Sequence, residues 1–168
     1  MAWTTPETFT AGQTLTAASM NAISGNTEAL QFARVLGYEQ RTTTYTATQQ
    51  VAGITSAADI FTDITFTADG TSAYRVEWYF PYFSLNASAQ PRLHLVDGSG
   101  NDLGFLNFNE DGTSPISGTY YYTPSSGSVT INMRGTRLSG SPTWGAGAGG
   151  AGAYIPAFVI VTGPVDLT

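Results

Sequence analysis

The chain of 168 residues is 42% hydrophobic and 12% aromatic, which is enough for the core of one domain of ordinary size plus a short appendage. Only 11% of the residues are charged, the net charge is -6, and the six basic residues are arginines scattered along the chain. Scattered arginines form no basic stripe, so binding to a nucleic-acid backbone is not expected. The absence of cysteine excludes disulfides and thiolate metal sites.

Residues 1–10 contain neither the basic region nor the apolar core of a secretion signal. The longest dense apolar run, Ala153 to Val161, is about half as long as the roughly 20 residues that a membrane-spanning helix needs. We therefore expect a protein that is made in the cytoplasm, has no membrane partner, and can leave the cell as part of a particle.

Residues 1–12 are predicted to form an extended arm. This segment is rich in threonine, Pro6 opposes a helix, and Trp3 and Phe9 are isolated aromatic residues. Such a segment is too short to build a core of its own, so we expect its apolar side chains to contact another surface.

A helix is predicted from Leu15 to about Arg34, with Thr16 as its N-cap and Gly37 stopping it. Its apolar residues form a narrow seam, which suits a partner helix better than a globular core. The alternative is that the helix packs on its own β domain. A lone helix of this length is marginal in water, so it needs a docking partner in either case. The candidate anchoring residues of the arm and helix are Trp3, Phe9, Leu15, Met20, Ile23 and Leu30.

From Tyr38 onward the chain is predicted to consist of strands and turns with no interposed helix. About eight or nine strands at this spacing favour an antiparallel jelly-roll sandwich. The expected organisation is an arm and anchoring helix in residues 1–37 and a β domain in residues 38–168. The expected strands cover residues 41–48, 50–55, 60–66, 74–85, 92–96, 103–108, 116–123, 129–134 and 154–162.

The strand within residues 74–85 is predicted to be central, because it is the most β-prone run in the sequence. Alternation places Tyr74, Val76, Trp78 and Phe80 on a core face. Pro81 cannot donate to a ladder, so we expect a bulge or a sheet edge there. The opposite face starts with an Arg75/Glu77 pair and then turns apolar, so either the protein's own arm or loop covers it or it is a subunit interface. The candidate interface residues on this face are Tyr79, Phe83 and Leu85.

No residue is predicted to be catalytic. His94 is the single histidine and alternates with Leu93 and Leu95 in a strand, which favours a structural role, and no serine motif accompanies it. Most acidic residues lie in turns, several of them beside glycine. The sequence therefore predicts a protein that is not an enzyme and has no cofactor.

Two further segments are weighed as ligand sites and rejected. Asp97, Ser99 and Asn101 have the spacing of a calcium loop, but Asp102 and Phe108 stand where that loop needs glycine and glutamate. The glycine run of residues 145–152 lacks the lysine and the serine or threonine of a phosphate loop. Its glycines allow either close backbone approach, as near a symmetry axis, or simple flexibility.

Residues 3–30, WTTPETFTAGQTLTAASMNAISGNTEAL, resemble the N-terminal segment of small minor structural proteins of tailed bacteriophages, especially those of actinobacterial hosts. The shared features are Trp-Thr-Thr-Pro, an aromatic-Thr-x-Gly step, and Leu-Thr-Ala-Ala opening a helix. The blocks FTADGTSAYRVEWYFPYFS, LHLVDGSGNDLGFLNF, PISGTYYYTPSSGSVTINMR and GAGAGGAGAYIPAFVIV resemble the β domain of the same proteins. That domain is similar to trimeric jelly rolls of the tumour-necrosis-factor and complement-C1q kind.

The resemblance implies a non-enzymatic virion protein, assembled in the host cytoplasm and located on the surface of the phage particle. The expected form is a homotrimeric capsid decoration protein, a minor capsid or head-fibre protein that its arm and helix anchor to the major capsid protein or another virion protein. The alternative is a minor tail protein at a fibre tip. Such a protein would bind a host surface protein or glycan through aromatic residues such as Tyr120, Tyr121, Tyr122 or Trp144.

Overall fold

A computed structural model describes residues 34–47, 54–55, 57–84, 91–107 and 113–165. The chain divides into two compact units, Met1–Arg34 and Val35–Thr168, and the description below concerns the second. The predicted arm, the predicted helix and Leu85 lie outside the described residues. The same holds for all the anchoring candidates, which are Trp3, Phe9, Leu15, Met20, Ile23 and Leu30.

The described part of the chain contains ten strands. Two of them, β2 and β9, are short. In chain order the strands are β1 (Arg34–Arg41), β2 (Tyr45–Thr46), β3 (Ile64–Ala68), β4 (Ala73–Ser84), β5 (Pro91–Asp97), β6 (Asp102–Asn107), β7 (Thr113–Tyr122), β8 (Gly127–Arg137), β9 (Thr143–Gly145) and β10 (Ala157–Val165).

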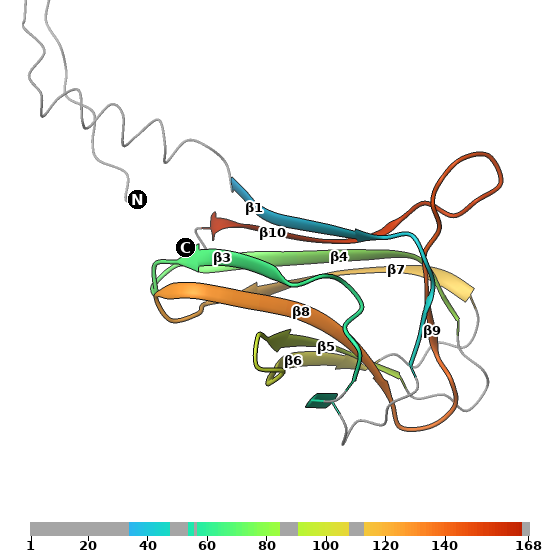
Figure 1. The fold of residues 1–168 in the computed structure, drawn as a ribbon, viewed down its shortest axis with the longest axis horizontal. Helices are drawn as coiled ribbons and strands as arrows, with labels where there is room; N and C mark the ends of the chain where they lie inside the picture. The colour runs from blue at the N-terminus through green and yellow to red at the C-terminus, as the bar shows by residue number, and fades with distance from the viewer. Residues whose placement is uncertain (1–33, 48–53, 56, 85–90, 108–112, 166–168) are drawn as a thin grey trace, which may run out of the picture. The chain divides into compact units, whose positions relative to one another are not determined.

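The strands form two sheets that pack face to face (Figure 1). The six-stranded sheet has the order β1-β10-β4-β9-β2, with β7 on the other side of β4, and the four-stranded sheet has the order β3-β8-β5-β6. Strands β10 and β9 pair with successive parts of β4, because β10 pairs with residues 73–79 and β9 with residues 82–84. The prediction of a mainly β fold with antiparallel sheets is thereby confirmed, and the two packed sheets are compatible with a jelly-roll-like sandwich.

The core lies between the sheets and follows the predicted alternation along most strands. In β4, Tyr74, Val76, Trp78 and Phe80 are all buried, as predicted. Strand β3 alternates strictly between buried and exposed residues. The four-stranded sheet adds Leu93, Leu95, Ile131 and Met133 to the same hydrophobic cluster.

Strand β4 contains a bulge at Pro81, as predicted. Phe80 pairs with Ile116 and Phe83 with Ser114, so two residues of β4, Pro81 and Tyr82, face one residue of β7. That residue is Pro115. Neither Pro81 nor Pro115 has a backbone N–H, so the bulge leaves neither proline with an unpaired donor.

The bulge makes one prediction wrong. Phe83 does not share the outer face with Tyr79, because the extra residue changes the phase of the alternation and turns Phe83 into the core. Its side chain is only 2% exposed and its ring lies 5.2 Å from that of Trp144. Tyr82, which an uninterrupted alternation would turn into the core, is half-buried and lies on the outer face.

The first and last strands also differ from the predictions. Strand β1 begins at Arg34, so the predicted boundary at residues 37 and 38 falls within a strand, and Gly37 belongs to that strand. A Cβ at Gly37 would lie 2.2 Å from Cγ2 of Ile64, so glycine is required by this contact. The last strand spans residues 157–165 instead of 154–162, which leaves Tyr154 and Ile155 in the preceding loop.

Aspartates organise two of the predicted turns. The Asp97 carboxylate accepts hydrogen bonds from the backbone N–H groups of Ser99 and Asn101 and from the Asn101 side chain, in the turn between β5 and β6. These bonds, that of the Asn101 side chain first, lower the pKa of Asp97. Asp69 accepts from Thr71 and Ser72 in the same manner before β4. These contacts confirm that both aspartates shape turns.

We predict that Trp144→Ala lowers the free energy of unfolding by about 3–5 kcal/mol, the usual cost of removing a large aromatic side chain from a core. Trp144 is fully buried between Tyr45 and Phe83, with ring centroids 5.8 and 5.2 Å away. Urea unfolding measures the loss. Leu138→Ala is the control, since Leu138 is exposed and its truncation should change stability by less than about 0.5 kcal/mol.

Candidate functional site

The outer face of the six-stranded sheet carries two groups of aromatic side chains, here together called the aromatic face. The Phe158 ring stacks on Tyr38 of β1 at 6.2 Å and on Tyr79 of β4 at 5.7 Å. Beyond the bulge, Tyr82 contacts Tyr154 at 4.5 Å. Tyr38 is 50% and Tyr154 53% exposed, so the described chain leaves much of this surface open.

Two glycines and the bulge in β4 together position the Tyr82 and Tyr154 side chains of the aromatic face. Tyr82 pairs with Gly145 of β9, and a Cβ at Gly145 would lie 2.0 Å from Cε1 of Tyr82. The ring therefore lies flat over the glycine backbone. A Cβ at Gly147 would lie 2.2 Å from the carbonyl oxygen of Tyr154. The glycine run thus permits close backbone approach, and it does so within this chain.

The outer face of the four-stranded sheet has a different character. Arg134 of β8 forms an ion pair with Asp59 at 2.6 Å and donates to the carbonyl groups of Ile54 and Thr55. In contrast, the outward charges of β4, Arg75 and Glu77, pair with each other at 3.0 Å, as predicted. The two faces of the sandwich thus differ: the outer face of the four-stranded sheet carries charged groups and the exposed ring of Phe105, whereas that of the six-stranded sheet carries most of the outward-facing aromatic rings.

The structure separates the aromatic residues that were proposed to meet a host ligand. Trp144 is 0% exposed and belongs to the core, so a role in contacting a ligand is wrong for this residue. Tyr120 and Tyr122 are partly buried and pack against the core. Of this group, only Tyr121 is largely exposed, at 48%, and it lies beside Arg75 on the outer side of β7.

His94 forms a chain of hydrogen bonds that resembles a catalytic triad. Its Nδ1 lies 2.9 Å from an oxygen of Asp102, and its Nε2 lies 2.8 Å from the hydroxyl of Thr136. Because a carboxylate only accepts, we assign the ring proton to Nδ1, and the Thr136 hydroxyl then donates to Nε2. This carboxylate–imidazole–hydroxyl order is the one that serine hydrolases use.

Burial argues against catalysis at this triad-like group. Thr136 is 0% and His94 1% exposed, so a substrate has no access to the hydroxyl. The Phe105 ring lies 5.5 Å from the imidazole, and the Arg92 guanidinium lies 4.6 Å from the Phe105 ring centroid. The group instead satisfies a buried imidazole, in agreement with the predicted structural role of His94.

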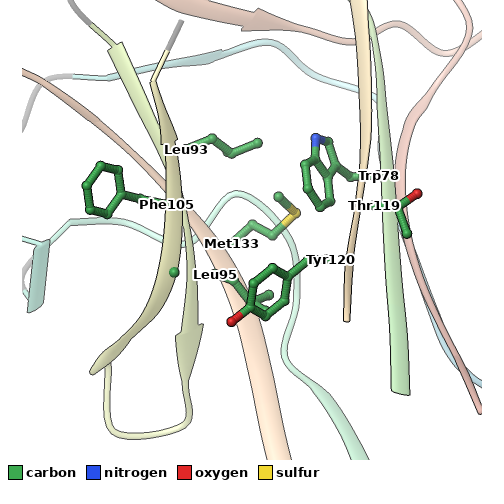
Figure 2. Close-up of a pocket in the computed structure, with 8 residues that line it drawn as sticks. Trp78, Leu93, Leu95, Phe105, Thr119, Tyr120 and Met133 are labelled. Carbon is green, nitrogen blue, oxygen red and sulfur yellow. The ribbon is translucent and has the colours of Figure 1, made fainter. Parts of the chain in front are cut away.

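A cavity of about 180 Å³ lies between the sheets, beside the edge strands β6 and β7 (Figure 2). Figure 2 shows Leu93, Leu95 and Met133 facing Trp78 and Tyr120 across it, with the Phe105 ring on the far side of its strand. The lining is mainly apolar and consists of Trp78, Leu93, Leu95, Gly104, Phe105, Thr119, Tyr120 and Met133.

No cluster of three or more histidine or acidic residues that could hold a metal ion occurs among the described residues. The Asp97 carboxylate accepts the hydrogen bonds of its own turn. Within the described ranges, no helix is both long and apolar enough to span a bilayer.

Sequence reasoning missed two features of these sites. The outward position of Tyr82 is one of them, although Pro81 indicates the bulge that produces it. The cavity had no sequence signal of its own, since its lining comes from five strands. Gly104, which pairs with Leu95 and faces inward, is the one local indication of the cavity in the sequence. A glycine within a strand has no side chain to pack against its neighbours.

Comparisons with known proteins establish no family for this chain. No protein-family model matches it, and no curated protein matches it. Among solved structures, the CBM22-1 xylan-binding domain of Xyn10C from Paenibacillus barcinonensis is similar over 78% of this chain and 94% of its own length, at 12% identity and a TM-score of 0.27. A similarity this weak supports no conclusion about fold or function.

We predict that stability falls as the pH drops below about 6.5, the usual pKa of histidine. Burial lowers the pKa of His94, Arg92 lowers it further, and Asp102 only partly offsets this. The unfolded chain therefore binds the proton at a higher pH than the folded chain does. The contribution is fully present above the unfolded pKa and is lost as the pH falls from there to the folded pKa.

Urea unfolding between pH 7.5 and 5 measures this effect. Since His94 is the only histidine in the chain, His94→Gln should remove most of the slope in this window. Carboxyl groups titrate mainly below about pH 5 and contribute little here. A wild-type protein whose stability is constant over this range would contradict the prediction.

Proposed function

We propose that this protein is a non-enzymatic structural protein of a bacteriophage virion, a homotrimer that decorates the capsid. The observation that supports this proposal best is the aromatic face. Exposed aromatic side chains that gather on one side of a sheet are typical of a contact surface. The partner proposed for this face is a second copy of the chain.

The difference between the two faces supports this choice of partner. Tyrosine and phenylalanine bury large apolar areas at small entropic cost, and the Arg75/Glu77 pair leaves no net charge on the outer side of β4. The outer face of the four-stranded sheet, with the Arg134–Asp59 ion pair and with the Arg92 guanidinium over the exposed Phe105 ring, is better suited to solvent. Contact between copies through the aromatic face would therefore bury the apolar side and leave the polar side exposed.

The proposals of three copies and of a phage particle rest on the sequence resemblance to phage structural proteins. The jelly-roll-like sandwich agrees with the expectation of a trimeric domain of the tumour-necrosis-factor and complement-C1q kind, which we propose as the finer fold class. The resemblance of residues 3–30 to minor structural proteins of tailed phages supports attachment to the major capsid protein or another virion protein. Attachment at three points lets weak individual contacts hold the trimer firmly.

The alternative is a minor tail protein that binds a host protein or glycan. One observation favours it: Tyr121 is 48% exposed on β7, outside the ring contacts of the aromatic face. Under either proposal the protein is on the virion surface and needs no cofactor.

We predict that the purified chain is a trimer, with a mass by light scattering three times its 17.7 kDa. Tyr38→Glu places a charge in the aromatic face on a half-exposed side chain, so it should shift the mass toward the monomer without unfolding the domain. The control is Leu138→Glu, an equally exposed apolar position away from this face, which should stay trimeric. A wild-type monomer at micromolar concentration would refute the trimer, and equal behaviour of the two variants would refute the assigned surface.

We also predict that the first 33 residues attach the protein to the particle and are not needed for folding. The described hydrophobic cluster lies entirely within residues 36–161, so a variant lacking residues 1–33 should unfold cooperatively and still be trimeric. It should fail to bind phage particles that lack the protein, whereas the full chain binds them. A truncated chain that still decorates particles would place the anchor elsewhere.

Copy number separates the two proposed locations. Cryo-electron microscopy of the intact particle should show many copies distributed over the head if the protein is a decoration protein. A few copies confined to the tail tip, together with loss of adsorption in Tyr121→Ala, would instead establish the alternative.

A further inference from the structure

The cavity between the sheets has the size and lining of a site for a small apolar molecule. Its volume is about 180 Å³, and its lining side chains are mainly apolar. An engineered apolar cavity of about 150 Å³ in another protein stays dry and binds benzene or xenon, so a site of this size holds one aromatic ring.

Two inward positions beside the cavity, one on each edge strand, have no side chain. Gly104 of β6 pairs with Leu95 and faces the interior, and a Cβ there would already lie 3.3 Å from the Tyr120 ring. Gly118 of β7 pairs with Trp78. The Trp78 indole occupies the space of a side chain at position 118, because a Cβ there would lie only 2.3 Å from Cζ2 of the indole. The two glycines therefore let the Tyr120 and Trp78 rings, which line the cavity, pack closely against the edge-strand backbone.

The walls favour an aromatic occupant over an aliphatic one. The Trp78 indole and the Tyr120 ring line one side, and the thioether of Met133 faces them (Figure 2). Aromatic rings and sulfur are polarizable and interact favourably with the faces and edges of a further ring. Tyr120 is held in place, because its hydroxyl donates to the carbonyl of Leu103 at 2.9 Å and so joins the two edge strands.

One wall also contains an unsatisfied donor. The indole N–H of Trp78 is buried and has no hydrogen-bond partner within the described part of the chain. Buried donors are normally satisfied, so an unpaired one in a cavity wall is unusual.

From these observations we propose that the cavity between β4, β5, β6, β7 and β8 binds a small molecule built on a single aromatic ring. The site is separate from the aromatic face, since none of its lining residues belongs to that face. The proposal is therefore independent of the oligomeric state and of the particle to which the protein belongs.

Benzene is the probe, titrated into the full-length chain labelled with ¹³C at the methionine methyl groups. The Met133 methyl signal should shift saturably, and intermolecular nuclear Overhauser effects should connect benzene with Met133 and the Tyr120 ring. Met133→Leu assigns the methyl signal. The absence of a saturable shift in the folded wild-type chain, or Overhauser effects only to Tyr79 and Phe158 of the aromatic face, would overturn the proposal.

A cavity-filling variant with a matched control tests the location. Leu95→Phe places an extra ring in the cavity and should weaken benzene binding about tenfold or more, since overpacking a filled site is unfavourable. The control Leu138→Phe makes the same change on an exposed side chain and should bind as the wild type does. If Leu95→Phe does not fold, Leu93→Phe fills the same cavity from the neighbouring inward position of β5. Undiminished binding in a folded cavity-filled variant would overturn the proposal.

Discussion

The extra residue in β4 at Pro81 is the constraint on which the rest of the sandwich depends. Before the bulge, β4 pairs with β10 and β7 and directs Trp78 and Phe80 inward. After it, the same strand pairs with β9 and directs Phe83 inward against Trp144. A regular strand would place Phe83 on the outer face and leave Trp144 without its neighbour.

Proline makes this change of phase possible at little cost. Pro81 and Pro115 lie at the same place on neighbouring strands, and neither has an N–H to leave unpaired. A second break in pairing, between Thr162 and Val165 of β10, contains Gly163 and Pro164. Both irregularities in the pairing of β4 thus occur at a proline, which has no backbone N–H to donate to the ladder.

The same bulge shapes the surface that we assign to contact between copies. Because Tyr82 turns outward, it contacts Tyr154, while Tyr79 and Tyr38 contact Phe158 on the other side of the bulge.

The buried His94 imidazole has its hydrogen bonds within the fold. Its two ring nitrogens are hydrogen-bonded to Asp102 and Thr136. The Trp78 indole N–H is an exception, and it lies in the wall of the cavity.

The sequence by itself determined the features that depend on neighbouring residues. The alternation of β3, the inward face of β4 up to Phe80, the bulge at Pro81 and the turns at Asp69 and Asp97 follow from stereochemistry within a few residues. Tertiary structure alone decided the direction of Phe83, the burial of Trp144 and the partners of His94. These depend on contacts between distant segments, such as Thr136 with His94, 42 residues apart, and local periodicity contains no information about such contacts.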